Sequence, residues 1–582
     1  MKIYVMPSPV EKIKDDSRGI RGNIEPTLAS DATHFSEDDY QLLKFHGTYQ
    51  QDDRDLRVKR KQEGLDKAWS FMVRTKCPGG DITAERYLVL DRLADEVANG
   101  TMRITTRQGI QFHGVLMKSL RQCIASVNKA GITTWGACGD VVRNTLATST
   151  PLRDAAHDDV QRLGKEISDT FLPHASSYQE IWVNGKKLES NAALEDEPIY
   201  GKHYLPRKFK IALAVPPQND VDIYSNDLGF VCHAPNGKVE GYTILVGGGF
   251  GMTHGLLKTY PVLALPLFYV KREHALAAAI AIVQTQRDNG NRDDRKLSRL
   301  KYVIEQKGIE WFRAEVVSRL KAPTETVKPF QFTTVADRLG WHEQGDGKLF
   351  CGVWVSQGRI KDADKIRYRT GFRTIVQRIG CPVRLTANCN ILFYNIEPSK
   401  RGEVDQILKE HDIPHSDGFT EARKTSHACV ALPTCGLALA ESERVFSSVM
   451  DGIDAILREL RLEKEPILIR MSGCPNGCPR PYNADIAFVG RGPKKYAVFL
   501  GGSIVGDRLV GLEHKSVEEK NLPKAVRPYL EEFAAKRKSG ETFSAFWGRT
   551  HVTGPRPVPE QFHVELAERA AKLVGAKLEP VG

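Results

Sequence analysis

Two stretches of the sequence decide the fold, Met102-Arg-Ile-Thr-Thr-Arg-Gln-Gly-Ile-Gln-Phe112 and Val383-Arg-Leu-Thr-Ala-Asn-Cys-Asn-Ile-Leu-Phe393. Each one predicts a short aliphatic strand, a polar loop and a second strand that ends in an aliphatic-x-Phe pattern. They lie about 280 residues apart. A repeat of this kind predicts a duplicated half-domain whose two copies face each other about a pseudo-dyad.

Outside the repeat, short β-branched runs alternate with amphipathic helices, for example at 84–98 and 119–130. This alternation predicts an α+β or α/β body, and 582 residues exceed what one core normally supports. The first seventy residues are polar and carry both charges, so no fold is assigned to them. The expected units are 1–70 as an N-terminal arm, 71–140 together with 328–412 as the duplicated halves, 141–327 and 413–582.

The composition is that of an ordinary soluble protein, with 41% hydrophobic and 27% charged residues. No apolar run is long enough to span a bilayer, and the apolar start is too short for a secretory signal. We therefore expect a cytoplasmic protein with no membrane partner. The net charge of +11 favours anionic partners. Without a basic tail or an aromatic-basic repeat, we expect no nucleic acid among them.

Four of the eleven cysteines are clustered, as Cys429-x5-Cys435 and Cys474-x3-Cys478. Two short loops thus supply four thiolates, the number that a 4Fe–4S cluster needs. Prolines in both loops disfavour regular helix, and a helix predicted from Leu437 would place its positive end beside Cys435. A zinc site with four thiolates and four buried thiols remain alternatives, although zinc sites usually have x2 to x4 spacing.

At these loops the sequence resembles a known family. Thr434-Cys-Gly-Leu-Ala-Leu-Ala-Glu-Ser-Glu-Arg444 and Gly473-Cys-Pro-Asn-Gly-Cys-Pro-Arg480 are similar to the signature of the sulfite and nitrite reductases. The resemblance implies that the four cysteines hold a 4Fe–4S cluster and that Cys478 also binds sirohaem iron. It also implies a pseudo-symmetric core of ferredoxin-like halves, with 141–327 as a sirohaem- and substrate-binding domain and 413–582 as a cluster- and sirohaem-binding domain.

Further segments resemble the haemoprotein (beta) subunit of the NADPH-dependent assimilatory members in particular; they are 45–55, 103–114, 204–210, 216–220 and 245–249. The resemblance implies six-electron reduction of sulfite to sulfide, for sulfate assimilation and cysteine biosynthesis. Electrons would come from a separate flavoprotein (alpha) subunit that carries FAD and FMN and oxidises NADPH.

Sulfite is a dianion and sirohaem is rich in carboxylates, so the site must gather positive charge. Lys208 and Lys210 alternate with Phe209 on a predicted strand, which puts both ammonium groups on one face. By resemblance, the substrate pocket is lined by Arg74, Arg143, Lys208 and Lys210. Any one of them taken singly would more often be a solvated surface charge.

The first repeat loop supplies further candidates. Arg103 and Arg107 would clamp carboxylates of sirohaem, and Gln111 and His113 on the following strand would face the macrocycle, although His113 could equally be a core histidine. In the second repeat Asn388 stands where the first has Arg107, with Arg384 and Asn390 beside it. The glycine runs at 247–249 and 501–502 mark loops where the backbone can approach a ligand closely.

Three other readings stay open. A ferredoxin-dependent sulfite or nitrite reductase would share the cofactors and differ in its donor. An iron–sulfur electron carrier would need the four cysteines without the basic pocket. A four-cysteine structural metal protein, with or without nucleic acid, would bind no sirohaem.

Overall fold

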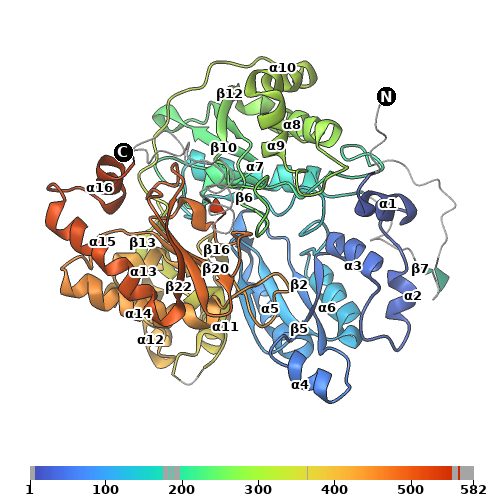
Figure 1. The fold of residues 1–582 in the computed structure, drawn as a ribbon, viewed down its shortest axis with the longest axis horizontal. Helices are drawn as coiled ribbons and strands as arrows, with labels where there is room; N and C mark the ends of the chain where they lie inside the picture. Colours follow the sequence, from blue (N-terminus) through green and yellow to red (C-terminus); the bar gives the residue numbers. More distant parts are fainter. Residues whose placement is uncertain are drawn as a thin grey trace, which may run out of the picture.

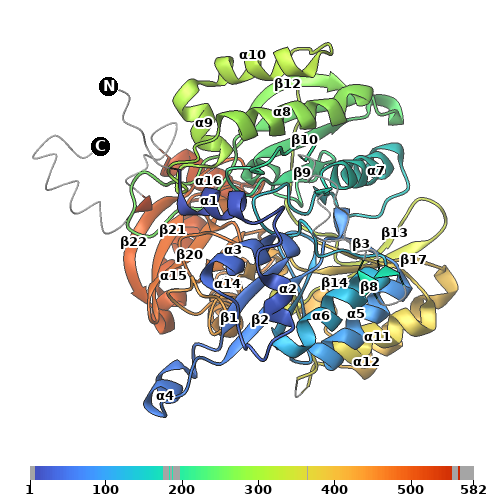
Figure 2. The same ribbon diagram turned by 90° about the vertical axis from the view of Figure 1, so that its right-hand side faces the viewer.

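A computed structural model describes residues 7–174, 182, 183, 186, 187, 197–363, 365–552, 562 and 563. Within these residues the strands form four five-stranded sheets and one two-stranded pair, β7 (Trp182–Val183) with β8 (Lys186–Lys187). Figures 1 and 2 show the helices lying around the sheets. The mixed α and β architecture with several sheets confirms the predicted fold class. The outer ends of the predicted units 1–70 and 413–582, and part of 141–327, lie outside the described residues.

Two of the sheets are copies of each other. Their orders are β1-β2-β5-β4-β15 and β13-β14-β17-β16-β3. The first sheet contains β1 (Thr48–Asp52), β2 (Trp69–Arg74), β4 (Met102–Ile104), β5 (Ile110–Val115) and β15 (Arg359–Ile360). The second contains β13 (Gly340–Glu343), β14 (Leu349–Val353), β16 (Val383–Leu385), β17 (Ile391–Ile396) and β3 (Asp81–Ile82). Each copy therefore gives a two-residue edge strand to the other.

The two repeat loops have the same internal hydrogen bonds. In the first, the Thr105 amide donates to the Gly109 carbonyl at 2.9 Å, and the Gly109 amide donates to Thr105 Oγ1 at 3.4 Å. In the second, Thr386 and Asn390 exchange the equivalent bonds, both at 2.9 Å. The duplication predicted from the sequence is confirmed down to these contacts.

The other two sheets also share one topology, in which three parallel strands are followed by two antiparallel ones. One contains β6 (Leu146–Ala147), β9 (Ile211–Ala214), β10 (Leu228–His233), β11 (Gly241–Val246) and β12 (Leu265–Lys271). The other contains β18 (His427–Ala428), β19 (Ile469–Ser472), β20 (Ile486–Gly492), β21 (Lys495–Leu500) and β22 (Gly511–Glu518). The whole body is thus a duplicated pair of sheets.

Helices bury the apolar faces of these sheets in three main cores. The two half-domain sheets share one core with α5 (Ala84–Val97), α6 (Met117–Lys129), α11 (Tyr368–Ile379) and α12 (Arg401–Glu410). The β6–β12 sheet packs with α7 (Ala155–Thr170), α8 (Ala275–Asn289), α9 (Leu300–Lys307) and α10 (Ile309–Leu320). The β18–β22 sheet packs with α13 (Glu421–Thr425), α14 (Glu443–Glu459), α15 (Leu522–Lys536) and α16 (Phe543–Thr550).

The first seventy residues, which the sequence left without a fold, are ordered into short elements. They form α1 (Pro9–Asp16), α2 (Ile24–Leu28), α3 (Glu37–Leu43), α4 (Arg57–Gln62) and the edge strand β1. Lys14 is buried and pairs with Glu11 at 2.7 Å and with Asp140 at 3.1 Å, which ties α1 to the body. The contact with Asp140 joins residues far apart in the chain, so local polarity gave no sign of it.

None of the helices in the described residues is both long and apolar enough to cross a membrane.

Candidate active site

The four clustered cysteines lie at one edge of the β18–β22 sheet. Cys429 directly follows β18, and Cys474 comes soon after β19, its parallel neighbour. The carboxyl ends of parallel neighbouring strands meet at the same sheet edge, where α/β proteins commonly bind ligands. The topology therefore brings the two cysteine loops together from 39 residues apart in sequence.

The thiols interact but do not crowd around one point. Burial, then the nearby thiols Cys478 and Cys429, raises the pKa of Cys435 to about 11. The same causes raise the pKa of Cys474. Yet no three Cys, His, Asp or Glu side chains of the described residues are close enough to hold a single metal ion. A 4Fe–4S cluster takes one thiolate on each iron, so the four cysteines of these two loops supply the number of ligands that it needs.

Two features of these loops suit a cluster that shares one ligand with a second group. Polar hydrogens point at cysteine sulfurs: the Gly473 amide lies 3.3 Å from Cys429 Sγ, and Asn476 Nδ2 lies 3.7 Å from Cys474 Sγ. Cys478 is exposed, whereas Cys474 is buried and the other two thiols are half-buried. An accessible Cys478 can accept a further metal on its outer side.

The helix expected from Leu437 begins six residues later, at Glu443. The amides of Leu439 and Ala440 both donate to the Gly473 carbonyl, at 2.8 and 3.0 Å, which holds that segment in a loop. The amide of Glu443 donates to the Cys429 carbonyl at 3.0 Å. The prediction placed the positive helix end beside Cys435; it lies beside Cys429 instead.

The four predicted substrate-pocket residues come from separate elements and share one electrostatic environment. Arg74 ends β2, Arg143 precedes β6, and Lys208 and Lys210 lead into β9, which begins at Ile211. The strand thus starts later than predicted, but the expected alternation holds, since Phe209 is buried between two half-buried lysines.

Positive charge in this region exceeds what nearby carboxylates neutralise. Burial, then Arg143 and Lys210, holds the pKa of Lys208 well below its usual value. Burial, then Arg299 and Arg107, lowers the pKa of Lys210 to about 7. Asp227 faces the same groups but is already held by Arg299 at 2.8 Å. Crowded cations that are partly withdrawn from water are costly without a partner, so this environment fits a carboxylate-rich cofactor and a dianionic substrate.

Tyr49 joins the two arginines of the set, and sequence reasoning missed it. Its hydroxyl lies 3.4 Å from Arg143 Nη2, and its ring centroid lies 5.9 Å from the Arg74 guanidinium carbon. Arg74 also donates to Cys138 Sγ at 3.1 Å. When the Gln111 amide is turned so that its oxygen faces Arg74, that oxygen accepts from Nε at 3.0 Å.

Arg103 and Arg107 are engaged by the protein itself. Arg103 pairs with Glu443 at 3.1 Å and donates to the Ala428 carbonyl at 2.9 Å. Arg107 donates to Asn226 Oδ1 at 2.9 Å and to the Asn144 carbonyl at 2.8 Å. Burial, then the nearby Arg143, lowers the pKa of Arg107 to about 9. Clamping of cofactor carboxylates by these two guanidinium groups stays a prediction.

His113 lies on β5, the strand after the first repeat loop, and Asn388 lies in the second repeat loop. His113 is buried, its Nδ1 lies 3.3 Å from Arg359, and its Nε2 has no hydrogen-bond partner in the structure. Burial, then Arg359, holds the pKa of His113 well below its usual value, so the ring is neutral. Asn388 donates to the Val335 carbonyl at 2.8 Å and accepts from Arg480 at 3.2 Å.

Arg480, two residues after Cys478, was not predicted and occupies the centre of the site. It pairs with the fully buried Asp222 at 2.6 Å. It also donates to the carbonyls of Thr106 at 3.1 Å and Ala387 at 2.9 Å, one in each repeat loop. Its place directly after the cysteine motif was the one available signal.

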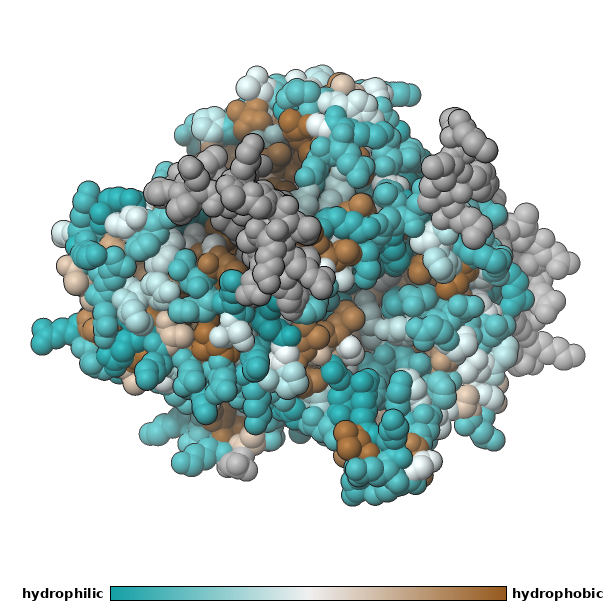
Figure 3. All heavy atoms as spheres, in the orientation of Figure 1, coloured by the Kyte–Doolittle hydropathy of each residue, from teal (hydrophilic) through white to brown (hydrophobic). Residues whose placement is uncertain are grey.

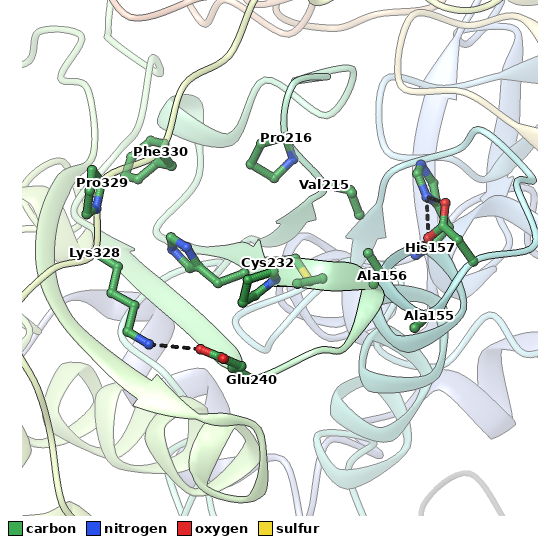
Figure 4. A pocket seen from close by; sticks show the side chains of 15 residues that line it. Ala155, Ala156, His157, Val215, Pro216, Cys232, Glu240, Lys328, Pro329 and Phe330 are labelled. Atoms are coloured by element: carbon green, nitrogen blue, oxygen red, sulfur yellow. Dashed lines mark hydrogen bonds and ion pairs between the residues drawn. The ribbon is translucent and has the colours of Figure 1, made fainter.

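The β6–β12 sheet has a cavity at the edge where its topological copy, the β18–β22 sheet, carries the cysteine loops. The cavity, about 680 Å³, is lined by Val215 and Pro216 after β9 and by residues 155–157 at the start of α7 (Figure 4). These positions correspond by topology to those of Cys474 after β19 and Glu443 at the start of α14. Cys232 is its lone cysteine, so the two copies differ in chemistry.

A second cavity, about 970 Å³, lies between the first half-domain and α7. Neither cavity is lined by the four clustered cysteines or by the four predicted pocket residues. We therefore define the candidate site by its contacts and charges.

Comparisons with known proteins agree with this architecture. A family model described as the nitrite/sulfite reductase ferredoxin-like half domain matches residues 66–130 and again 342–411. A second, described as the nitrite and sulphite reductase 4Fe-4S domain, matches residues 164–324. The second range contains β9, β10, β11 and β12 of the β6–β12 sheet, whereas the four cysteines lie in the topological copy of that sheet.

Several curated relatives are similar over nearly their whole length. The proteins of Staphylococcus saprophyticus and Anoxybacillus flavithermus are 41% and 42% identical over 555 and 558 residues, covering 95% and 96% of this chain and 97% and 98% of theirs. Both are named sulfite reductase (NADPH) hemoprotein beta-component, as is a 42% identical protein of Chromohalobacter salexigens.

A solved structure, the Mycobacterium tuberculosis NirA protein, matches with a TM-score of 0.75 at 22% identity. The match covers 93% of this chain and 96% of that one, and it supports the fold.

Proposed function

This chain belongs to the nitrite and sulfite reductase family, and on that premise we propose that it is the haemoprotein subunit of an NADPH-dependent assimilatory sulfite reductase. Its reaction is the six-electron reduction of sulfite to sulfide. The observation that carries the proposal is that the four thiols lie near a group of cations, the half-buried Lys208 and Lys210 and the buried Arg143, whose positive charges act on one another.

Cys429, Cys435, Cys474 and Cys478 would hold the 4Fe–4S cluster, and Cys478 would also bind the iron of sirohaem. When bound, the two groups supply the electron transfer and the bond-breaking chemistry. The Gly473 amide and Asn476 would direct positive dipoles at the cluster ligands. Arg103, Arg107, Gln111, His113 and Asn388 would line the sirohaem.

Arg74, Arg143, Lys208 and Lys210 would hold the oxygens of sulfite and offset its charge. Arginine suits bidentate contacts with oxygens, and lysine suits a mobile proton donor. A pKa of about 7 would let Lys210 give up a proton at Nζ near neutral pH and recover it from water. Tyr49 would orient both arginines through the contacts described above.

The relatives' name, a beta-component, supports a multi-subunit enzyme. We propose that electrons come from a flavoprotein alpha subunit carrying FAD and FMN, with NADPH as the source, in the cytoplasm. We also propose the division into an arm (1–70), paired half-domains (71–140 with 328–412), a substrate domain (141–327) and a cluster domain (413–582).

The test is the visible spectrum of the purified protein with iron and acid-labile sulfide analysis, repeated for Cys478→Ser. We expect haem bands, about four cluster irons plus one haem iron, and a clear change of the haem bands in the variant. Reduced methyl viologen should drive sulfite reduction by the unsubstituted protein. A colourless or zinc-containing protein, or haem bands indifferent to the substitution, would contradict the proposal.

A further inference from the structure

A cavity that the proposed reaction does not use lies between the first half-domain and α7. It measures about 970 Å³ and is lined mainly by residues from three segments. They are 76–86, which leads from β2 into α5, 128–135 at and after the end of α6, and 161–174 in α7 and the loop that follows. We call it the Lys76 cavity. Its volume is in the range of sites that hold a small organic molecule.

The outer surface of the molecule is mixed in character. On the described part of the face in Figure 3, hydrophobic residues stand in separate groups among hydrophilic ones. A surface that docks a partner protein would show a larger continuous apolar patch. The cavity is therefore the better candidate for a further binding site.

Lys76 is the group that makes this cavity unusual. It is only 4% exposed, and its ammonium group donates to the Ser168 carbonyl at 3.1 Å. Within the described residues it makes no ion pair, because Asp169, whose charge reaches it, is paired with Lys165. Burial lowers the pKa of Lys76 to about 8. Lysine is rarely buried to this extent without a carboxylate, so an anion in the cavity would supply the missing partner.

The backbone around Lys76 is fixed by the fold. The Lys76 amide donates to the Thr133 carbonyl at 2.7 Å, and the two residues form an isolated β-bridge. The amide of Thr75 donates to the Ile110 carbonyl on β5 at 2.9 Å. The first half-domain and the loop after α6 therefore place Lys76 at the cavity wall before any ligand arrives.

Arg86 adds a second cation from the first turn of α5. Its Nε donates to the Ala130 carbonyl at 3.1 Å, and it has no ion pair in the part of the chain that the structure describes. Glu85, the neighbouring carboxylate, is exposed. Burial raises the pKa of the Cys77 thiol to about 11, although the charge of Arg86 opposes this rise. Arg86 thus lies within electrostatic reach of the residue next to Lys76.

The remaining lysine and arginine residues of the wall are already held by carboxylates. The pairs are Arg162 with Asp159, Lys165 with Asp169, and Arg384 with Asp81. Lys76 and Arg86 are therefore the two cations of the wall that are left for a ligand.

The cavity also has an apolar side. Ile132, Trp135, Leu172 and two prolines line it. The indole ring is fixed, since Trp135 Nε1 donates to the Pro173 carbonyl at 2.9 Å. An inorganic anion would leave these side chains against water, whereas a molecule with an apolar body would cover them.

We propose that the Lys76 cavity binds an organic anion, a small molecule that carries a phosphate, sulfonate or carboxylate group on an apolar body. Lys76 and Arg86 hold the anionic group, and the side chains around Trp135 cover the body. This site goes beyond the proposed function and depends on neither the sirohaem nor the cluster.

The test labels Lys76 with pyridoxal 5′-phosphate, which carries a phosphate, an aromatic ring and an aldehyde. In the purified full-length protein at pH 8, the neutral amine attacks the aldehyde and forms an imine with loss of water. Borohydride then adds a hydride to the imine carbon and fixes the label as a secondary amine, which peptide mapping locates. We expect the labelling rate of Lys76 to level off as the probe concentration rises, because binding precedes the imine.

Lys44 in the same sample is the internal control. Burial lowers its pKa to about 8 as well, but it lines neither of the two cavities, so it should label more slowly and in proportion to probe concentration. Arg86→Gln should slow the labelling of Lys76 about tenfold, the effect of losing one charged contact, and leave Lys44 unchanged. Arg92→Gln, on an exposed arginine of the same helix that pairs with Glu96, should change neither rate.

Two competitors separate an organic ligand from an inorganic one. Phenyl phosphate should protect Lys76 at concentrations about tenfold below those of inorganic phosphate, because only its ring covers the apolar side. Equal protection by the two would overturn the organic class of the ligand. Labelling of Lys76 in proportion to probe concentration, or no faster than that of Lys44, would overturn the site itself.

Discussion

The ammonium group of Lys210 makes the stability of the cofactor-free protein depend on pH. Burial and the nearby Arg299 and Arg107 lower its pKa to about 7, whereas an unfolded lysine has a pKa of about 10.4. Between these values the unfolded chain binds more protons, so stability rises with pH across this window. The slope from one such group is at most about 1.4 kcal/mol per pH unit.

Lys210→Met should remove this contribution. We expect the free energy of unfolding in urea, compared at pH 7.5 and pH 9 without cofactors, to rise less in the variant than in the unsubstituted protein. Burial mainly lowers the pKa of Lys44 and of Lys76 to about 8, so both lysines also make the free energy of unfolding rise with pH. The effect of Lys210 is therefore read as the difference in this rise between the variant and the unsubstituted protein. Lys321→Met is the surface control. Identical slopes would show that Lys210 keeps a normal pKa.

At this scale the sequence predicted residues whose role follows from a motif, and it missed those whose role follows from a partner. The spacing of the four cysteines and of Lys208 and Lys210 can be read directly from the sequence. Tyr49 is one tyrosine of seventeen until the fold brings it to Arg143. Asp222 likewise shows no sign of a role in the sequence, because its partner Arg480 lies in the connection between β19 and β20, far along the chain.

The helix α14 is connected to the cysteine loops by its first residue. Glu443 pairs with Arg359 at 2.7 Å and with Arg103 at 3.1 Å, and its amide bonds Cys429. Burial alone would raise the pKa of Glu443, but Arg359 and Arg103 outweigh it and hold the pKa below its usual range. Glu443→Gln should therefore cost about 3 kcal/mol of unfolding free energy, because it leaves two arginines without their carboxylate.

Urea unfolding of Glu443→Gln measures this cost, and the cluster absorption of the loaded protein reports whether Cys429 moves. Glu421→Gln is the matched control, since its pair with Lys424 is far more exposed and should contribute less than about 1 kcal/mol. An equal effect of both substitutions would show that Glu443 is an ordinary surface carboxylate.

Elements differed from prediction where long-range contacts overrode local pattern. The amphipathic helices expected at 84–98 and 119–130 are present as α5 and α6, since their periodicity is local. The helix expected from Leu437 was delayed because the Gly473 carbonyl captures two of its amides. The two-residue strands β3 and β15 form only by pairing with the opposite half-domain, so no local sequence pattern could predict them.

At the scale of the whole molecule, duplication explains why one buried ion pair sits at the centre. Asp222 and Arg480 occupy equivalent positions, each with a left-handed backbone and each opening a short 3-10 helix, at Ile223–Ser225 and Pro481–Asn483. Two copies facing each other about a pseudo-dyad bring such positions together. Since one copy carries a carboxylate and the other a guanidinium, they attract.

Asp222→Asn tests whether this pair joins the sheets. Asp222 is fully buried and holds Arg470 and Arg480, both at 2.6 Å. Asparagine keeps the shape and a hydrogen-bonding oxygen but leaves two buried guanidinium groups without a countercharge, so we expect a loss of about 3–5 kcal/mol in urea unfolding.

Asp288→Asn is the comparison, because Asp288 is about a third exposed and pairs with Arg287 and Arg319 on the surface, so its loss should stay near or below about 1 kcal/mol. Arg480 also reaches Thr106 and Ala387, one in each half-domain, so the centre of the molecule should loosen as a unit. Amide hydrogen exchange should then rise in both repeat loops together. Faster exchange in one loop alone would mean that the halves are held by their own sheets, and that the central pair only fills the space between them.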